Sequence, residues 1–200
     1  MSQDKPKKAS VDGTDLYFGI VAARYNNELV EALIKRVRAT LREARVSEKS
    51  IKVLRVPGAA EVPYVASMLA HTDEYDCLIA LGVVVKGDTN HNEVLAHSTA
   101  IELQAIATRT EIPVINGILS VETREQAEER VNGKTDRGAE FARAAIEMAW
   151  HRVQLGDYLD SLDAEYERSA MAAEAQDFLG FDSDDEDGDF NPGRSPFHKN

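Results

Sequence analysis

The feature that most constrains this chain is an alternation of short apolar runs with longer amphipathic segments, repeated four times before residue 155. The run at residues 16–23 is apolar without polar interruption, which is typical of a strand buried on both faces. Residues 27–45 then place apolar side chains at helical spacing. This repetition predicts an α/β domain with a mainly parallel sheet and helices on both faces.

The predicted elements follow in a regular order. Strands are expected at residues 16–23, 51–56, 77–85 and 113–121. Helices are expected at residues 27–45, 61–71, 93–109, 123–130 and 138–155. Thr123 is expected to cap the fourth helix, with Gln126 completing a capping box. Ligands bind at the carboxyl ends of the strands in sheets of this kind, so the loops after the strands are the places to look for function.

The net charge of −12 belongs almost wholly to the end of the chain. Residues 156–200 hold 13 acidic and three basic residues, which leaves residues 1–155 with a net charge of −2. Neither part has the basic surface that nucleic acid requires, so no nucleic-acid partner is expected.

Composition divides the chain into three parts. Residues 1–14 are expected to be flexible, residues 15–155 to form the folded domain, and residues 156–200 to form an acidic extension that is partly helical or disordered. The extension has two interpretations. It is either a solvating tail that deters non-specific association, or a segment that binds a basic partner or lines a shell.

A single cysteine, Cys77, excludes a disulfide framework, and its apolar neighbours predict a buried, inert thiol. No apolar run approaches the roughly 18 residues of a membrane span. Residues 1–10 are polar and basic and lack the apolar stretch of a secretory signal. A cytoplasmic protein without a membrane partner is expected.

Three familiar signals are incomplete. Gly133, Lys134 and Thr135 end like a phosphate-binding P-loop, but Glu128 stands where that motif needs its first glycine. The acidic run at residues 182–189 lacks the final glutamate of a calcium loop. The two histidines at positions 91 and 97 would lie on different faces of a helix. We therefore expect no metal and no cofactor.

Five segments carry a more specific pattern. Residues 23–26 (Ala-Arg-Tyr-Asn), 56–63 (Val-Pro-Gly-Ala-Ala-Glu-Val-Pro) and 82–91 (Gly-Val-Val-Val-Lys-Gly-Asp-Thr-Asn-His) each meet a strand end, and residues 113–119 and 130–138 follow. Together, over about 140 residues and in unbroken order, they resemble the 6,7-dimethyl-8-ribityllumazine synthase family. The resemblance implies a flavodoxin-like three-layer α/β/α sandwich with four strands, to which the N-terminal residues could add one more.

The resemblance also implies a reaction. The family condenses 5-amino-6-(D-ribitylamino)uracil with 3,4-dihydroxy-2-butanone 4-phosphate through a Schiff base, and expels phosphate and water. Both substrates are reactive, so positioning supplies much of the acceleration. The pocket must hold a flat pyrimidine, bind a phosphate and relay protons.

For the pyrimidine and its ribityl chain, the resemblance implies Tyr25, Asn26, Ala59, Ala60, Glu61, Val84, Val85 and Asn116. Tyr25 would stack on the ring, although a strand-end aromatic taken alone is more often a core residue. Glu61 would accept hydrogen bonds from sugar hydroxyls, although a loop glutamate is usually just solvated. Ala60 and Asn116 stand where many members have Phe, so the ring-binding walls are less aromatic here.

For the phosphate, the resemblance implies Gly87, Asp88, Thr89, Arg130 and Arg137. Lys134 is an alternative to Arg137, because the segment between Arg130 and the last helix is one residue shorter than usual. His91 matches the family's proton-transfer histidine, and it and Arg130 are the expected catalytic residues. A lone histidine at a helix start is otherwise more often an ordinary residue of the cap region, and an exposed arginine is ordinarily solvated surface.

The family places its sites between subunits, so the resemblance implies a homo-oligomer, either a pentamer or an assembly of pentamers such as a decamer or 60-mer. Small molecules are the expected partners. Two alternatives remain: a non-catalytic protein on the same scaffold that holds a lumazine or flavin, and a structural shell or cargo scaffold.

Overall fold

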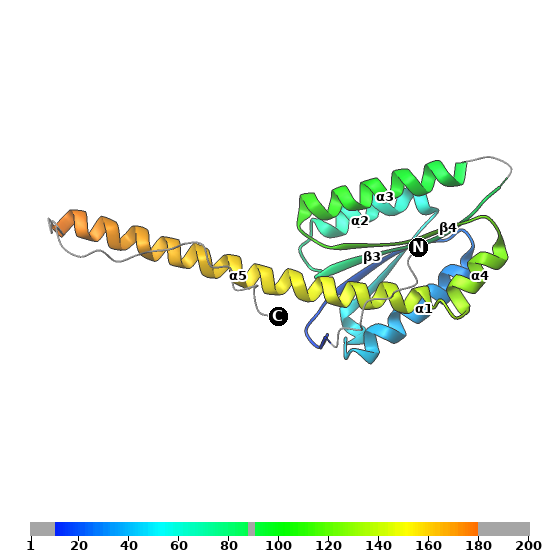
Figure 1. The fold of residues 1–200 in the computed structure, drawn as a ribbon, viewed down its shortest axis with the longest axis horizontal. Coiled ribbons are helices and arrows are strands. Elements are labelled where there is room, and N and C mark those ends of the chain that lie inside the picture. Colours follow the sequence, from blue (N-terminus) through cyan, green and yellow to red (C-terminus); the bar gives the residue numbers. More distant parts are fainter. Residues whose placement is uncertain (1–10, 88–90, 180–200) are drawn as a thin grey trace. The chain divides into compact units, whose positions relative to one another are not determined.

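The computed structural model describes residues 11–87 and 91–179 (Figure 1). Its strands are β1 (Phe18–Ala23), β2 (Ile51–Val56), β3 (Cys77–Val85) and β4 (Val114–Val121). Its α-helices are α1 (Asn27–Glu43), α2 (Val62–Ala70), α3 (His91–Thr110), α4 (Arg124–Asn132) and α5 (Arg137–Leu179). Two short 3-10 turns, η1 (Glu48–Ser50) and η2 (Ala59–Glu61), precede β2 and α2.

The four strands form one sheet in the order β2-β1-β3-β4, and every pair is parallel. This confirms the predicted α/β class and parallel sheet. β1 lies between β2 and β3, with Ala22 opposite both Arg55 and Leu81. β3 runs past the end of β1, because its last paired residue toward β1 is Leu81 whereas it pairs with β4 as far as Val85.

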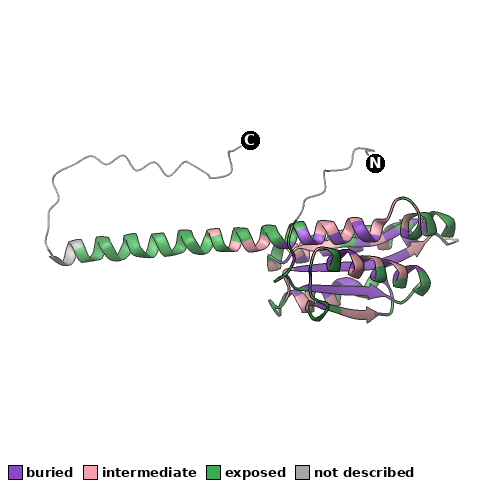
Figure 2. Ribbon diagram, turned by 90° about the horizontal axis from the view of Figure 1, so that it is seen from below, coloured by how far each residue is buried: buried purple, intermediate pink, exposed green. Residues whose placement is uncertain are grey.

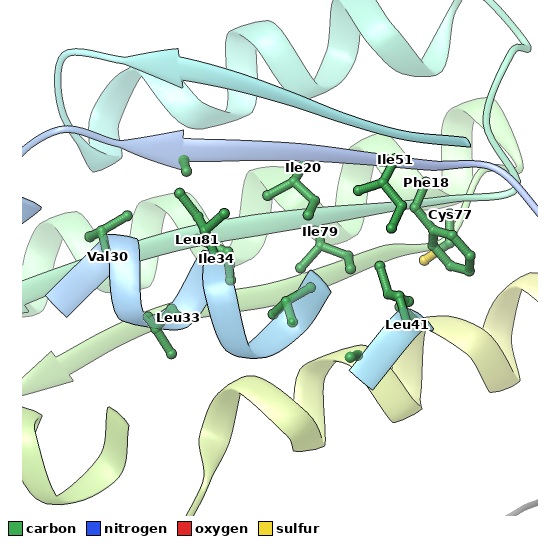
Figure 3. Close-up of a cluster of buried hydrophobic side chains, with 14 of the residues drawn as sticks. Phe18, Ile20, Val30, Leu33, Ile34, Leu41, Ile51, Cys77, Ile79 and Leu81 are labelled. Atoms are coloured by element: carbon green, nitrogen blue, oxygen red, sulfur yellow. The ribbon is translucent and has the colours of Figure 1, made fainter. Parts of the chain in front are cut away.

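Helices cover both faces of the sheet, as expected for a three-layer sandwich (Figure 1). α1, α4 and α5 pack on one face, where Phe18, Ile20, Ile79 and Leu81 meet α1 (Figure 3). α2 and α3 pack on the other face, against the alternate residues of the same strands. β1 is buried along its whole length, which explains why its sequence shows no polar alternation (Figure 2).

Cys77 belongs to the hydrophobic core between the sheet and helices α1, α4 and α5, and it is fully buried. Burial raises the pKa of its thiol far above the usual value, because the thiolate would be desolvated. The prediction of an unreactive packing cysteine is therefore confirmed.

Several helix ends differ from the predicted ones. α1 ends at Glu43 because Arg45 adopts a left-handed conformation (φ 69°), and its N–H and that of Val46 donate to the carbonyls of Arg42 and Leu41. This is a Schellman ending with arginine in the place usually taken by glycine. α3 begins two residues earlier than predicted, at His91.

The cap of α4 also differs in one partner. Thr123 Oγ1 accepts from the N–H of Gln126 at 3.3 Å, as predicted. The side chain of Gln126, however, accepts from the N–H of Glu122 at 3.0 Å and not from that of Thr123. The capping box is therefore shifted by one residue.

The last helix does not stop at residue 155. α5 continues to Leu179, since a single helical glycine such as Gly156 costs only about 1 kcal/mol. The chain divides into two compact units, Met1–Asp157 and Tyr158–Asn200. Within the second unit, residues 159–175 are all exposed (Figure 2). Among the residues described, no helix combines the length and apolar character needed to cross a membrane.

The expected additional N-terminal strand falls largely on residues 1–10, which lie outside the described residues. Residues 11–17 form a turn and coil, in which Asp12 accepts hydrogen bonds from the N–H and hydroxyl of Thr14.

Candidate active site

Tyr25 and the loop after β2 meet at the carboxyl ends of β1 and β2. Tyr25 is 74 % exposed, and a Cβ built on Gly58 would lie 3.4 Å from the Cδ2 atom of its ring. The ring therefore rests over the backbone of Gly58 with most of its surface open to solvent. An exposed aromatic beside a strand end is available to stack on a flat ligand.

The carboxylate of Glu61 turns back onto the same loop. Its Oε2 atom accepts from the N–H of Gly58 at 2.7 Å, which closes the short turn η2. Within this turn Ala59 is buried, whereas Ala60 and Glu61 are exposed. Glu61 is thus an exposed residue whose carboxylate is held beside Tyr25 by the backbone of Gly58.

Asn26 connects the β1 loop to β3. It adopts a left-handed conformation (φ 52°) before α1, and its Nδ2 donates to the carbonyl of Val83 at 2.8 Å. Asparagine tolerates this conformation better than most residues do. Its side chain therefore has a structural task in addition to any contact with ligand.

Arg55 braces the same loop, and sequence reasoning missed it. Its Nη2 donates to the carbonyl of Ala23 and to the side chain of Asn27, both at 2.9 Å, and it forms an ion pair with Glu31. The available signal was an arginine between apolar residues near the end of a strand, and its side chain is only 24 % exposed in the structure.

The end of β3 contributes Val84 and Val85, both half-buried, and the exposed Gly87. A Cβ built on Gly87 would meet nothing within 4 Å. Lys86, between them, donates its N–H to the carbonyl of Val121 and pairs with Glu122 at 2.8 Å. The hydrogen bond from its side chain to Glu122 raises the pKa of Lys86. Asp88 and Thr89 lie outside the described residues.

His91 is the first residue of α3, and it is exposed. The following residue, Asn92, is 5 % exposed, and its Oδ1 atom has no hydrogen-bond partner among the described residues. His91 is therefore accessible to solvent at this helix start, whereas Asn92 points into the protein. We call Tyr25, Asn26, Ala59, Ala60, Glu61, Val84 and Val85 the ring-side group.

Arg130 and Arg137 meet elsewhere, at the junction of α4 and α5. They line a surface depression of about 540 Å³ together with Glu125, Gln126, Glu129 and Thr135. Arg130 donates to the carbonyl of Gln126 at 3.4 Å, and Arg137 pairs with Glu140 at 2.8 Å. Lys134 does not line this depression. We call it the arginine depression.

Asn116 lies apart from the ring-side group. It stands on β4 opposite Ala80, which in turn is opposite Val21 of β1. Two strand spacings, about 10 Å, therefore separate it from β1. β4 is an edge strand, and Asn116 is exposed there, with its Oδ1 accepting from the N–H of Ile118 at 3.0 Å.

A second depression, of about 620 Å³, lies at the amino ends of the strands. Tyr17, Ser50 and Asp76 line it, and each directly precedes a strand. It contains none of the predicted site residues. Because ligands of parallel sheets bind at the carboxyl ends of the strands, we place the candidate site at those ends and not in this depression. No group of three or more potential metal ligands occurs among the described residues.

Comparisons with known proteins show the family of the chain. Residues 15–152 match the family model of 6,7-dimethyl-8-ribityllumazine synthase. The synthase of Paracidovorax citrulli is 42 % identical over 146 residues, which cover 73 % of this chain and 93 % of the relative. The synthase of Bordetella petrii is 43 % identical over 139 residues, which cover 70 % of this chain and 78 % of the relative. The synthase of Thermobifida fusca is 42 % identical over 143 residues, which cover 70 % of this chain and 82 % of the relative. The chain therefore belongs to the 6,7-dimethyl-8-ribityllumazine synthase family.

Proposed function

We propose that this protein condenses 5-amino-6-(D-ribitylamino)uracil with 3,4-dihydroxy-2-butanone 4-phosphate to form 6,7-dimethyl-8-ribityllumazine. The amine of the pyrimidine attacks the ketone to form a Schiff base with loss of water. Phosphate then leaves, and the second ring closes with loss of another water. This reaction belongs to riboflavin biosynthesis.

Three tasks are assigned to residues of this chain. The ring-side group holds the pyrimidine, with Tyr25 against its face and Glu61 accepting from ribityl hydroxyls. His91, exposed at the start of α3, transfers protons during imine formation and phosphate release. Arg130 and Arg137 bind the phosphate, with the loop at residues 87–89.

The observation that carries the proposal is the pairing of two arginines in one depression. One arginine from α4 and one from α5 line it, and guanidinium groups suit bidentate binding of phosphate. Arg137 is favoured over Lys134 for this task because it lines the arginine depression and Lys134 does not. A protein that only held a lumazine or flavin would need no phosphate clamp.

We further propose that each site is formed by two chains of a homo-oligomer, either a pentamer or an assembly of pentamers. In one chain, the ring-side group and the arginine depression share no lining residue among those described. Asn116 is likewise exposed on the edge strand β4, away from β1. A neighbouring chain that packs by this edge would bring its Asn116 and arginines to the ring-side group.

The reaction is tested by mixing both substrates with the native protein and following lumazine absorbance. Replacing His91 or Arg130 by alanine should slow turnover strongly while leaving the oligomer intact. Two matched controls are available: His97→Ala on α3 and Arg124→Ala on α4, both at exposed positions. Native protein without turnover would refute the assigned reaction.

The shared site is tested by co-expressing the His91→Ala and Arg130→Ala chains with different tags. If each site takes His91 from one chain and Arg130 from its neighbour, random mixing at equal amounts leaves about one quarter of the sites complete. The mixed oligomer should therefore regain about one quarter of native activity. A site within a single chain would regain none, because every chain lacks one group.

The catalytic domain is proposed to occupy residues 15–155, with residues 156–200 as an extension outside the chemistry. The predicted site residues that the structure describes all lie in the unit Met1–Asp157. Ending the chain after Asp157 should leave turnover unchanged. Particle mass measured by light scattering would show whether the extension affects assembly, and a fall in turnover would contradict this division.

A further inference from the structure

The segment that leads into α5 is fixed to α1 by one ion pair. Arg36 Nε lies 2.9 Å from both carboxylate oxygens of Asp136, and Arg36 Nη2 lies 2.8 Å from Oδ2. Three short contacts between the same two groups define both the position and the plane of the carboxylate. Both side chains are about one third exposed, so the pair is partly shielded from solvent.

Asp136 also organises the first turn of α5. It adopts a left-handed conformation (φ 45°), which is unfavourable for most residues. Its Oδ1 accepts from the N–H of Ala139 at 3.3 Å, and its carbonyl accepts from the N–H of Glu140 at 3.2 Å. The carboxylate thus serves as the cap of α5 and as the partner of Arg36 at once.

Gly138 makes the contact with α1 close. A Cβ at Gly138 would lie 2.8 Å from Cβ of Arg36 and 3.0 Å from its Cγ. Only a glycine allows the backbone of α5 to approach Arg36 in this way. Arg137 therefore stands between two residues, Asp136 and Gly138, that both rest on Arg36.

We propose that Arg36 is a positioning residue for phosphate binding: through Asp136 it fixes the backbone of Arg137, so that Arg137 and Arg130 face one depression. This role rests on the proposed function of that depression. Arg36 is assigned no contact with substrate. Its own charge is largely matched by Asp136 and by Glu43, 3.3 Å away.

The role predicts a selective kinetic change. In Arg36→Ala, the KM for 3,4-dihydroxy-2-butanone 4-phosphate should rise roughly tenfold, whereas the KM for the pyrimidine should change less than about twofold. Arg36→Lys, which keeps the charge but not the planar fork, should lie between native and Arg36→Ala. Asp136→Asn should resemble Arg36→Lys, because asparagine keeps the left-handed conformation and the cap.

A second readout does not need turnover. Inorganic phosphate should raise the Tm of the native protein by mass action. That shift should be greatly reduced in Arg36→Ala and reduced to an intermediate extent in Asp136→Asn. The control is Arg38→Ala. Arg38 lies on α1 like Arg36, but its ion pair is with Glu48 and not with Asp136. Arg38→Ala should keep the full phosphate shift.

The outcomes separate the two proposals. Native protein that is protected by phosphate but gives no lumazine would overturn the reaction and leave the positioning role intact. Equal increases in both KM values, or an unchanged phosphate shift in Arg36→Ala, would overturn the positioning role. Should Arg36→Ala fail to fold, Asp136→Asn decides by the same two measurements.

Discussion

Asn26 supplies a hydrogen bond that the sheet itself cannot make. β1 stops pairing with β3 at Leu81, so the carbonyl of Val83 has no strand partner on that side. The amide of Asn26 donates to it at 2.8 Å. Val83 is 2 % exposed, so water has little access to this carbonyl. Replacing Asn26 by Asp keeps the shape of the side chain and removes the donor.

The expected cost follows from these contacts. Losing a hydrogen bond costs about 1 kcal/mol net, and a buried carbonyl left without a donor costs about 1–3 kcal/mol. The new carboxylate would also face the oxygen of Val83. Aspartate tolerates the left-handed conformation, so backbone strain adds little. We expect Asn26→Asp to lower the free energy of unfolding by about 2–3 kcal/mol.

The measurement is urea unfolding at fixed protein concentration, because an oligomer's apparent stability depends on concentration. Asn116→Asp is the matched control. The side chain there accepts a hydrogen bond from the N–H of Ile118, and a carboxylate can accept it equally well. Equal stabilities of Asn26→Asp and Asn116→Asp would refute the reasoning.

Two further predictions concern packing and pH. Gly117→Ala should lower the free energy of unfolding by about 1–3 kcal/mol, because the new Cβ would lie 2.7 Å from the backbone oxygen of Ala80. The measurement is the melting temperature by calorimetry. The control is Gly82→Ala, whose Cβ would have ordinary contacts of 3.6 Å or more. Equal melting temperatures would contradict this. Hydrogen bonding to Arg36 holds the pKa of Asp136 below its usual value. The stabilisation is therefore present above the unfolded pKa of about 3.9 and is lost as pH falls through the folded value. Urea unfolding at pH 7 and pH 3 should show the advantage of native protein over Asp136→Asn shrinking at the lower pH, and a constant difference would contradict this.

The parallel sheet could be predicted from the sequence because burial on both faces leaves a local signature, as in the unbroken apolar run of β1. The end of α1 could not be predicted, because its Schellman ending uses Arg45 where a glycine would have been the signal. The continuity of α5 through Gly156 could not be predicted either, because the composition changes there, although the extension is expected to be partly helical.

In the candidate site, too, features with a local sequence pattern could be predicted and contacts between distant residues could not. Motif positions indicated Tyr25, Glu61 and the two arginines, but the contact of Asn26 with Val83 joins residues 57 positions apart. No local pattern encodes such a pair. The brace formed by Arg55 and the contact of Arg36 with Asp136 were missed for the same reason, since each depends on the three-dimensional approach of separate elements.

The burial of Cys77 makes the protein convenient for site-specific labelling. It is the only cysteine of the chain, and its shielded thiol, with its raised pKa, should not react with maleimides while the protein is folded. A cysteine introduced at an exposed position such as Gln154 would then be the single reactive group, with the native residue left in place. Fluorophores attached there could follow subunit exchange between differently labelled preparations.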